Sequence, residues 1–277
     1  MAHPQIVTLT TDFGLVDHFA GAMKGVMLDV FPEVRIVDIT HAIQAFDVLD
    51  GALAISESYK YFPSGSVHIV VVDPGVGSER RPILATVGEH YFVAPDNGVL
   101  SLVYAQAASV MVREITSSHY FRQPMSSTFH GRDVFAPVAA NLAKGVDPAK
   151  FGDEITDYVR FAAPKPKAAP DGSLRGIVLK IDRYGNLITN IRASDAPQLL
   201  GNDPPPFRIV IGKTEITEIY SHYAQGAPGE AFAILGSMGF LEISVNRGNA
   251  AKQLGIAKGA EVAIKMGSAA AASSQNV

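Results

Sequence analysis

The chain has 277 residues, of which 47% are hydrophobic and 18% are charged, so it can bury a large core and is long enough for two domains. It contains no cysteine, which excludes disulfides, a thiol nucleophile, thiolate zinc sites and iron–sulfur clusters. The net charge of −4 gives no electrostatic footprint for nucleic acid, and no apolar run reaches the length of a membrane span. With a short polar start before Ile6, we expect a cytoplasmic globular protein without nucleic-acid or membrane partners.

Residues 1–161 alternate between strand-like and helix-like patterns. Short β-rich or continuous apolar runs predict strands, and apolar residues at helical spacing predict helices. The strands are expected at 6–11, 34–39 and 67–72, a hairpin at 83–94, and helices at 19–31, 47–62 and 134–144. This alternation predicts an α/β domain with a mostly parallel sheet flanked by helices.

The composition changes at residue 162. Residues 162–172 contain three prolines and few apolar side chains, which is typical of a stiff exposed linker. Short strands separated by turns with Gly and Pro follow, at 174–181, 187–191, 207–211, 231–235, 241–245 and 261–265. We therefore expect a smaller all-β, barrel-like domain at 173–266 and a disordered Ala/Ser-rich tail at 267–277.

Polar side chains follow the first three predicted strands. Asp12 follows the first strand, Asp38, Thr40 and His41 follow the second, and Asp73 follows the third. Ligands of open α/β sheets bind beyond the carboxyl ends of the strands, so these residues are candidates for a site. Each aspartate could also simply begin a turn, but three such strand ends together favour a site.

The loop after Asp73 contains Gly75 and Gly77 and continues into Arg80 and Arg81. It has neither the G-x-G-x-x-G spacing nor the G-K-[S/T] ending of a phosphate-binding loop. The two arginines would be solvated loop residues if no ligand bound beside them. The glycines therefore give only weak support for a phosphate-binding loop.

His130 lies just before the helix predicted at 134–144, and we expect Asp133 to cap that helix. The polar residues are compatible with a metal-dependent hydrolase that uses Asp12, His41, Asp73 and His130. They are also compatible with a metal-free site in which Asp73, an arginine and His130 orient water, or with a small-molecule binding protein without chemistry. The sequence lacks H-x-x-x-H or paired-carboxylate spacing, which disfavours the metal site.

Four motifs occur in an order that resembles one known family. They are T-T-D-F-G at residues 10–14, D-P-G-V-G at 73–77, F-H-G-R-D at 129–133 and Y-G-N-L-I-T-N at 184–190. Together they resemble the S-adenosylmethionine hydroxide adenosyltransferases, also called S-adenosylmethionine hydrolases, which are related to the fluorinase and chlorinase. The resemblance extends from about residue 6 to residue 266.

The resemblance implies an N-terminal α/β domain, a β-barrel-like C-terminal domain, and a homotrimer with active sites between neighbouring subunits. It implies hydrolysis of S-adenosylmethionine to adenosine and methionine, with no cofactor and no metal ion. Residues 246–251 match the last family motif, which presents backbone groups to the adenine. The alternatives are a 5′-halo-adenosine synthase and a non-catalytic S-adenosylmethionine- or adenosine-binding protein.

The resemblance implies a catalytic triad of Asp73, Arg80 and His130. The fluorinase lacks all three and has Tyr in place of the loop aspartate, so their presence here favours water over halide. By the same resemblance, Asp12 would bind the ribose hydroxyls and Phe46 would lie beside the ligand.

The second domain is implied to bind the methionine end of the substrate. Asp182 and Asn186 would hold it, with Tyr184 stacking nearby and Ser237 presenting a polar group. Met238 departs from the arginine that the fluorinase has at this position. The segment from Asp182 to Asn186 would also connect two strands as an ordinary turn without any ligand.

Overall fold

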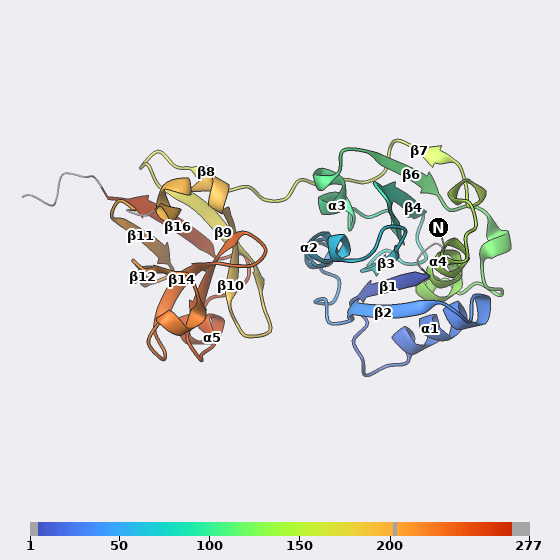
Figure 1. Ribbon diagram of the computed structural model, residues 1–277, viewed down its shortest axis with the longest axis horizontal. Helices are drawn as coiled ribbons and strands as arrows, with labels where there is room; N and C mark the ends of the chain where they lie inside the picture. The colour runs from blue at the N-terminus through green and yellow to red at the C-terminus, as the bar shows by residue number, and fades with distance from the viewer. Residues whose placement is uncertain (1–4, 202–203, 268–277) are drawn as a thin grey trace, which may run out of the picture. The chain divides into compact units, whose positions relative to one another are not determined.

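The computed structural model describes residues 5–201 and 204–267. The chain divides into two compact units, Met1–Ala163 and Pro164–Val277 (Figure 1). The boundary between them falls inside the segment predicted to be a linker. The tail predicted to be disordered lies, apart from Gly267, outside the described residues.

The first unit is built on a seven-stranded sheet with the order β2-β1-β3-β5-β4-β6-β7. Strands β2, β1, β3 and β5 pair in parallel, and β4, β6 and β7 continue the sheet through antiparallel pairs, so β4 and β7 oppose the common direction. The predicted mostly parallel sheet is confirmed. The strands are β1 (Ile6–Thr11), β2 (Arg35–Thr40), β3 (Val67–Val71), β4 (Pro82–Val87), β5 (His90–Pro95), β6 (Val110–Glu114) and β7 (Glu154–Ile155).

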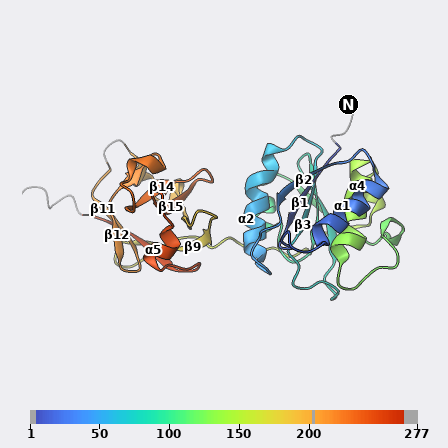
Figure 2. The ribbon, with the colours of Figure 1, turned by 90° about the horizontal axis from the view of Figure 1, so that it is seen from below.

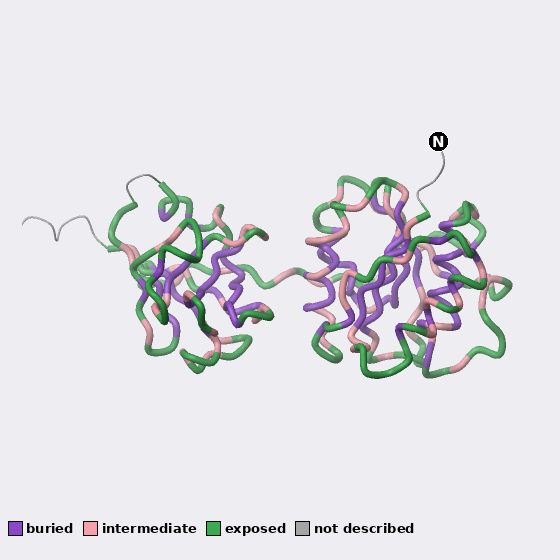
Figure 3. The backbone as a smooth tube through the Cα atoms, turned by 60° about the horizontal axis from the view of Figure 1, so that its bottom comes forward, coloured by how far each residue is buried: buried purple, intermediate pink, exposed green. Residues whose placement is uncertain are grey.

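Helices cover both faces of this sheet (Figure 2). Helices α1 (Phe19–Val30) and α4 (Ala136–Ala143) pack on one face, and α2 (Val48–Ser58) and α3 (Ser101–Gln106) pack on the other. Every residue of β3 is buried. Val67, Ile69 and Val71 pack in one core and Val70 packs in the other. Figure 3 shows buried backbone through the middle of this unit. Burial on both faces of the sheet explains why residues 67–72 form an almost continuous apolar run.

The segment that leads into α4 differs from the predicted helix. Residues Gly131–Phe135 form a π-helical turn before α4 begins at Ala136. His130 occupies the position before that turn, and Asp133 is buried inside it rather than capping a helix. The Asp133 carboxylate instead accepts hydrogen bonds from the Ser126 amide at 2.8 Å and from the Arg132 side chain. The predicted cap was therefore wrong, and Asp133 anchors the loop that precedes His130.

The second unit is a nine-stranded sheet with the order β12-β11-β16-β9-β10-β15-β14-β13, with β8 added beside β9. Strand β12 contacts β14, so the sheet curls around a single apolar core into the predicted barrel-like arrangement. The strands are β8 (Lys167–Ala168), β9 (Leu174–Ile181), β10 (Leu187–Arg192), β11 (Phe207–Ile211), β12 (Thr214–Ile216), β13 (Ile219–Tyr220), β14 (Ala231–Leu235), β15 (Phe240–Val245) and β16 (Glu261–Met266).

Four short elements of this unit, the strands β8, β12 and β13 and the helix α5, were not predicted from the sequence. Strand β8 lies within the predicted linker and pairs with β9, so part of that segment belongs to the sheet. Helix α5 (Ala250–Leu254) begins where the Asn249 side chain accepts from the Lys252 amide, and ends at Gly255 in the left-handed conformation. Within the described ranges of both units, no helix is long and apolar enough to cross a membrane.

Candidate active site

The carboxyl ends of β1 and β3 lie side by side and open into a cavity of the first unit. The cavity has a volume of about 290 Å³, and its lining includes Asp12, Phe46, Asp73 and His130. The parallel pairing of β1 with β3 explains why Asp12 and Asp73 reach the same edge of the sheet. The structure thus brings four of the predicted site residues together.

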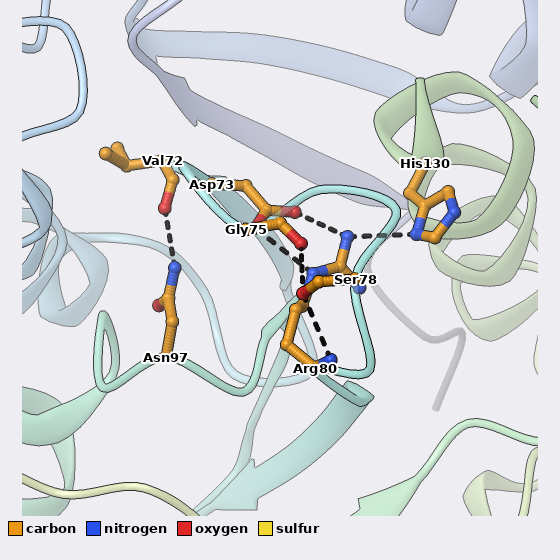
Figure 4. Close-up of polar contacts among 7 residues, drawn as sticks. All are labelled: Val72, Asp73, Gly75, Ser78, Arg80, Asn97 and His130. Atoms are coloured by element: carbon orange, nitrogen blue, oxygen red, sulfur yellow. Dashed lines mark hydrogen bonds and ion pairs between the residues drawn. The ribbon is translucent and has the colours of Figure 1, made fainter. Parts of the chain in front are cut away.

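Asp73 and Arg80 form a bidentate ion pair within one loop (Figure 4). Arg80 Nε donates to Asp73 Oδ1 at 3.1 Å, and Arg80 Nη2 donates to Asp73 Oδ2 at 2.5 Å. The Asp73 and Arg80 side chains are only 4% and 9% exposed, so solvent screens this pair little. The planar guanidinium therefore fixes both oxygens of the carboxylate.

The loop between these two residues is held by its own contacts. Ser78 Oγ donates to the Gly75 carbonyl at 2.7 Å, and Ser78 Oγ accepts from the Arg80 amide at 3.3 Å. Gly77 has a φ of 77°, and a Cβ there would meet the Ser127 carbonyl oxygen. Glycine is required at this point because the loop packs directly on the segment that leads to His130.

His130 joins the pair through Arg80. Arg80 Nη2 lies 2.9 Å from His130 Nδ1, and because a guanidinium can only donate, Nδ1 accepts and carries no proton. The neutral ring then has its proton on Nε2. Burial lowers the pKa of His130 below its usual value, and the charge of Arg80 lowers it further, against the opposing effect of Asp73 and Asp133. The site therefore holds a neutral imidazole beside a buried ion pair.

Asp12 and Phe46 are linked through the backbone. The Phe46 amide donates to Asp12 Oδ2 at 2.9 Å. Phe46 has a φ of 66°, a conformation that is rare for a bulky residue, and its side chain is 72% exposed. The Asp12 carboxylate thus stabilises an unusual backbone that presents an aromatic ring at the cavity.

One wall of the cavity is aromatic, which was not predicted from the sequence. Phe13, Phe19 and Phe129 line it, and their rings meet in tilted or edge-to-face pairs, with centroids 5.2 to 6.0 Å apart. Phe13 directly follows Asp12, and Phe129 directly precedes His130. Two of the three were therefore visible inside the motifs, although nothing in their spacing indicated that they would meet.

Asp38 and His41 lie apart from this arrangement. Asp38 is inside β2 rather than after it, which corrects the predicted position, and it pairs with Lys24. His41 Nδ1 lies 2.8 Å from Thr11 Oγ1, and His41 Nε2 lies 3.1 Å from Asp38 Oδ1. In residues 5–201 and 204–267 no group of three or more His, Cys, Asp or Glu side chains could hold a metal ion.

In the second unit, Asp182 organises the loop between β9 and β10. Asp182 Oδ1 accepts from the amides of Tyr184 at 2.9 Å and Asn186 at 2.8 Å, and Asp182 Oδ2 accepts from Asn186 Nδ2 at 2.8 Å. Tyr184 is 76% exposed. The structure therefore brings three of the predicted methionine-binding residues into one compact loop.

A second segment packs on this loop. The Ala251 amide donates to the Gly185 carbonyl at 3.0 Å. Gly185 has a φ of 90°, and a Cβ there would meet the Asn249 side chain. The predicted adenine-contacting segment at 246–251 and the Asp182 loop are thus neighbours, and only glycine permits their close approach.

Ser237 lies on a different turn, between β14 and β15, and is exposed. The guanidinium of Arg192 approaches this turn from β10, with Nη1 3.4 Å from the Met238 carbonyl oxygen, and it stacks on the Phe240 ring. A cation therefore lies beside this turn although residue 238 is methionine.

Comparison with known proteins agrees with this architecture. The family model described as the SAM hydroxide adenosyltransferase N-terminal domain matches residues 7–152, and that of the C-terminal domain matches residues 176–263. The chain belongs to the SAM hydroxide adenosyltransferase family. The resemblance recognised in the four sequence motifs is confirmed.

Among relatives of the chain, a protein of Salinispora tropica named (R)-S-adenosyl-L-methionine hydrolase is 34% identical over 96% of this chain and 100% of its own length. A protein of the same name from Thermus thermophilus is 36% identical over 92% of this chain and 98% of its own. A fluorinase of Nocardia brasiliensis is 28% identical over 95% and 97%. The crystal structure of an uncharacterized conserved protein from Thermotoga maritima has a TM-score of 0.86 and 35% identity, and the match covers 94% of this chain and 99% of that one.

Proposed function

We propose that this protein hydrolyses S-adenosylmethionine by attack of water at C5′ of the ribose, giving adenosine and methionine. The observation that carries the proposal is that Asp73 and His130, both bonded to Arg80, line one cavity with Asp12 and Phe46. The names of relatives at 34–36% identity support the same reaction. The cavity is near the lower end of the range of small-molecule sites, about 300–1,000 Å³, which suits the nucleoside end of the substrate.

The substrate's sulfonium is already a good leaving group, so the enzyme needs no acid to expel it. The water oxygen forms a bond to C5′, the C5′–S bond breaks, and its electron pair remains on sulfur as the neutral thioether of methionine. One proton leaves the attacking water. Because water is a weak nucleophile, catalysis consists of holding one water in line with the departing sulfur.

The three bonded residues divide this task. His130 Nε2–H can donate to the water oxygen, because Nδ1 is occupied by Arg80. Asp73 can accept a hydrogen bond from the water and then its proton, while Arg80 stays charged and holds the carboxylate in place. One oxygen lone pair of the water is left for C5′.

The remaining residues hold the substrate in this proposal. The Asp12 carboxylate accepts hydrogen bonds from the ribose hydroxyls, and the exposed ring of Phe46 covers the nucleoside. The Asp182 carboxylate has lone pairs that its own loop does not use, and these accept hydrogen bonds from the methionine ammonium. Asn186 holds the same end of the substrate. Tyr184 and Ser237 lie beside it and complete the contacts.

Assembly, location and cofactors belong to the same proposal. We propose a cytoplasmic homotrimer with its active sites at subunit interfaces. Leu15 and Val16, which are 79% and 98% exposed in the loop between the cavity residues Phe13 and Phe19, support burial of this loop by another subunit. No cofactor or metal ion takes part, because the leaving group needs no Lewis acid.

The test is to incubate the purified protein with S-adenosylmethionine in ¹⁸O-labelled water, with each sulfonium epimer supplied separately. Adenosine labelled in its 5′-hydroxyl is expected, with faster turnover of the R epimer, the form that the relatives' names specify. EDTA should leave the rate unchanged. Tight binding without turnover would instead indicate a non-catalytic binding protein, and loss of activity in EDTA would refute the metal-free mechanism.

A further inference from the structure

The carboxyl end of β3 has a polar contact that the catalytic proposal does not use. Asn97, just after β5, donates from Nδ2 to the Val72 carbonyl oxygen at 2.8 Å. Figure 4 shows the amide of Asn97 directed at this carbonyl, immediately before Asp73. The other end of the same amide, Oδ1, accepts from the Val99 backbone amide at 3.1 Å. Both ends of the Asn97 amide are therefore used.

This contact replaces a missing bond of the sheet. The parallel pairing of β3 with β5 ends at Ile69 opposite Val93, so it does not extend to Val72. Val72 is nonetheless completely buried, and a buried carbonyl needs a donor. The Asn97 side chain supplies that donor where the backbone of β5 does not.

Asn97 is itself held in a rigid frame. The preceding residue, Asp96, is buried and accepts from Arg81 Nη2 at 2.7 Å and from the Val159 amide at 2.8 Å. The Asn97 amide therefore extends from a fixed point of the fold, as a positioning group must.

We propose that Asn97 is a positioning residue that sets the orientation of the Asp73 carboxylate. The Val72 carbonyl and the Asp73 amide belong to one planar peptide unit, so holding the carbonyl also fixes the plane from which the Asp73 side chain departs. Arg80 holds the carboxylate from its far end. The proposal rests on the proposed hydrolysis, in which Asp73 must hold a water in line with C5′.

The rate of water attack is sensitive to the position of the Asp73 carboxylate. A displacement of about 1 Å in a catalytic group can cost roughly 100-fold in rate. Ground-state binding of the nucleoside, by contrast, is assigned to Asp12 and Phe46, which Asn97 does not contact in any described interaction. Loss of the Asn97 hydrogen bond is therefore expected to lower kcat and to leave KM nearly unchanged.

Asn97→Asp is the sharpest variant, because it is nearly isosteric and keeps an acceptor for the Val99 amide. It removes the donor and places a negative oxygen against the Val72 carbonyl. Asn141→Asp is the matched control, since Asn141 Nδ2 donates to the Pro137 carbonyl at 2.9 Å within α4 and has no described bond to Asp73. Asn97→Ala serves if the first variant does not fold.

We expect Asn97→Asp to lower kcat about 10- to 100-fold, with KM changed less than about threefold, and Asn141→Asp to change neither. A near-normal kcat in a folded Asn97 variant, or an effect confined to KM, would overturn the inference while the proposed function stood. The Arg80 Nε–H resonance in NMR spectra gives a readout without turnover. If the wild-type protein showed no hydrolysis, the proposed function would fail, and an Nε–H resonance unmoved by Asn97→Asp would refute the positioning role as well.

Discussion

Arg80 determines the tautomer of His130. The guanidinium Nη2 donates to His130 Nδ1 at 2.9 Å while it also holds Asp73, so the imidazole presents Nε2–H as its free donor. The two residues are 50 positions apart in the chain and meet because the loop after β3 packs on the segment before α4. A protonated His130 would lose this bond, since Nδ1 could no longer accept.

The first prediction concerns the acid limb of the profile of kcat/KM against pH. The pKa of His130 lies below its ordinary value of about 6.5, chiefly through burial and also through the charge of Arg80. The required form is neutral, so kcat/KM should fall as the pH falls through that lowered pKa, and the limb should lie below about pH 6.5. An NMR titration of the His130 ring measures the same pKa without turnover. In Arg80→Met, which removes the cation, that pKa should rise; a limb above pH 6.5 would contradict the assignment.

The second prediction separates water positioning from substrate binding. Asp73→Asn is nearly isosteric but removes the charge and the proton acceptor, so kcat should fall by a factor of about 100 to 10,000 with a small change in KM. Steady-state kinetics measure both parameters. A near-normal kcat would show that Asp73 does not orient the nucleophile.

The third prediction concerns Asp12. Asp12→Ala should act mainly on KM, since ribose contacts are present in both the ground and the transition state. Because Asp12 also holds the Phe46 amide, Asp12→Asn, which keeps an acceptor, should raise KM less than Asp12→Ala. Equal effects of the two variants would mean that the Phe46 backbone contact is unimportant, and an effect confined to kcat would place Asp12 in the chemistry.

The fourth prediction distinguishes water from halide as the nucleophile. The ionised Asp73 carboxylate repels an anion at the position where a halide would have to sit. Saturating chloride or fluoride should therefore give no 5′-halo-adenosine, as judged by chromatography of the products. Appearance of the halogenated nucleoside would assign the protein to the chemistry of its fluorinase relatives.

The fifth prediction tests the shared site of the proposed trimer. An inactive Asp73→Ala protein mixed with an inactive Asn186→Ala protein, after subunit exchange, should recover part of the activity. Mixing Asp73→Ala with Asp73→Asn provides the control, because both defects lie in the same unit and no intact site can form. Absence of recovery in the first mixture, or a monomer in solution, would rule out sites shared between subunits.

Much of this architecture follows from local sequence. The run at residues 67–72 is apolar at almost every position, which is the pattern of a strand covered on both faces, and β3 is such a strand. The hairpin around Gly88 and Glu89 forms as predicted. By contrast, β6 and α3 were missed. Only Val112 of β6 is buried, so that strand lacks an apolar run, and the six residues of α3 span fewer than two helical turns.

The motifs by themselves determined which residue types are available for chemistry and in which order they occur. Only the tertiary structure decided that Arg80 bonds both Asp73 and His130, that Asp38 and His41 pair with each other, and that Asp133 anchors a loop inside a π-helical turn. The physical reason is that backbone preference acts over a few neighbouring residues. The partner of a buried polar group, in contrast, is whichever group the packed sheet and helices bring within hydrogen-bonding distance. For the Val72 carbonyl, which precedes Asp73, that partner is the side chain of Asn97.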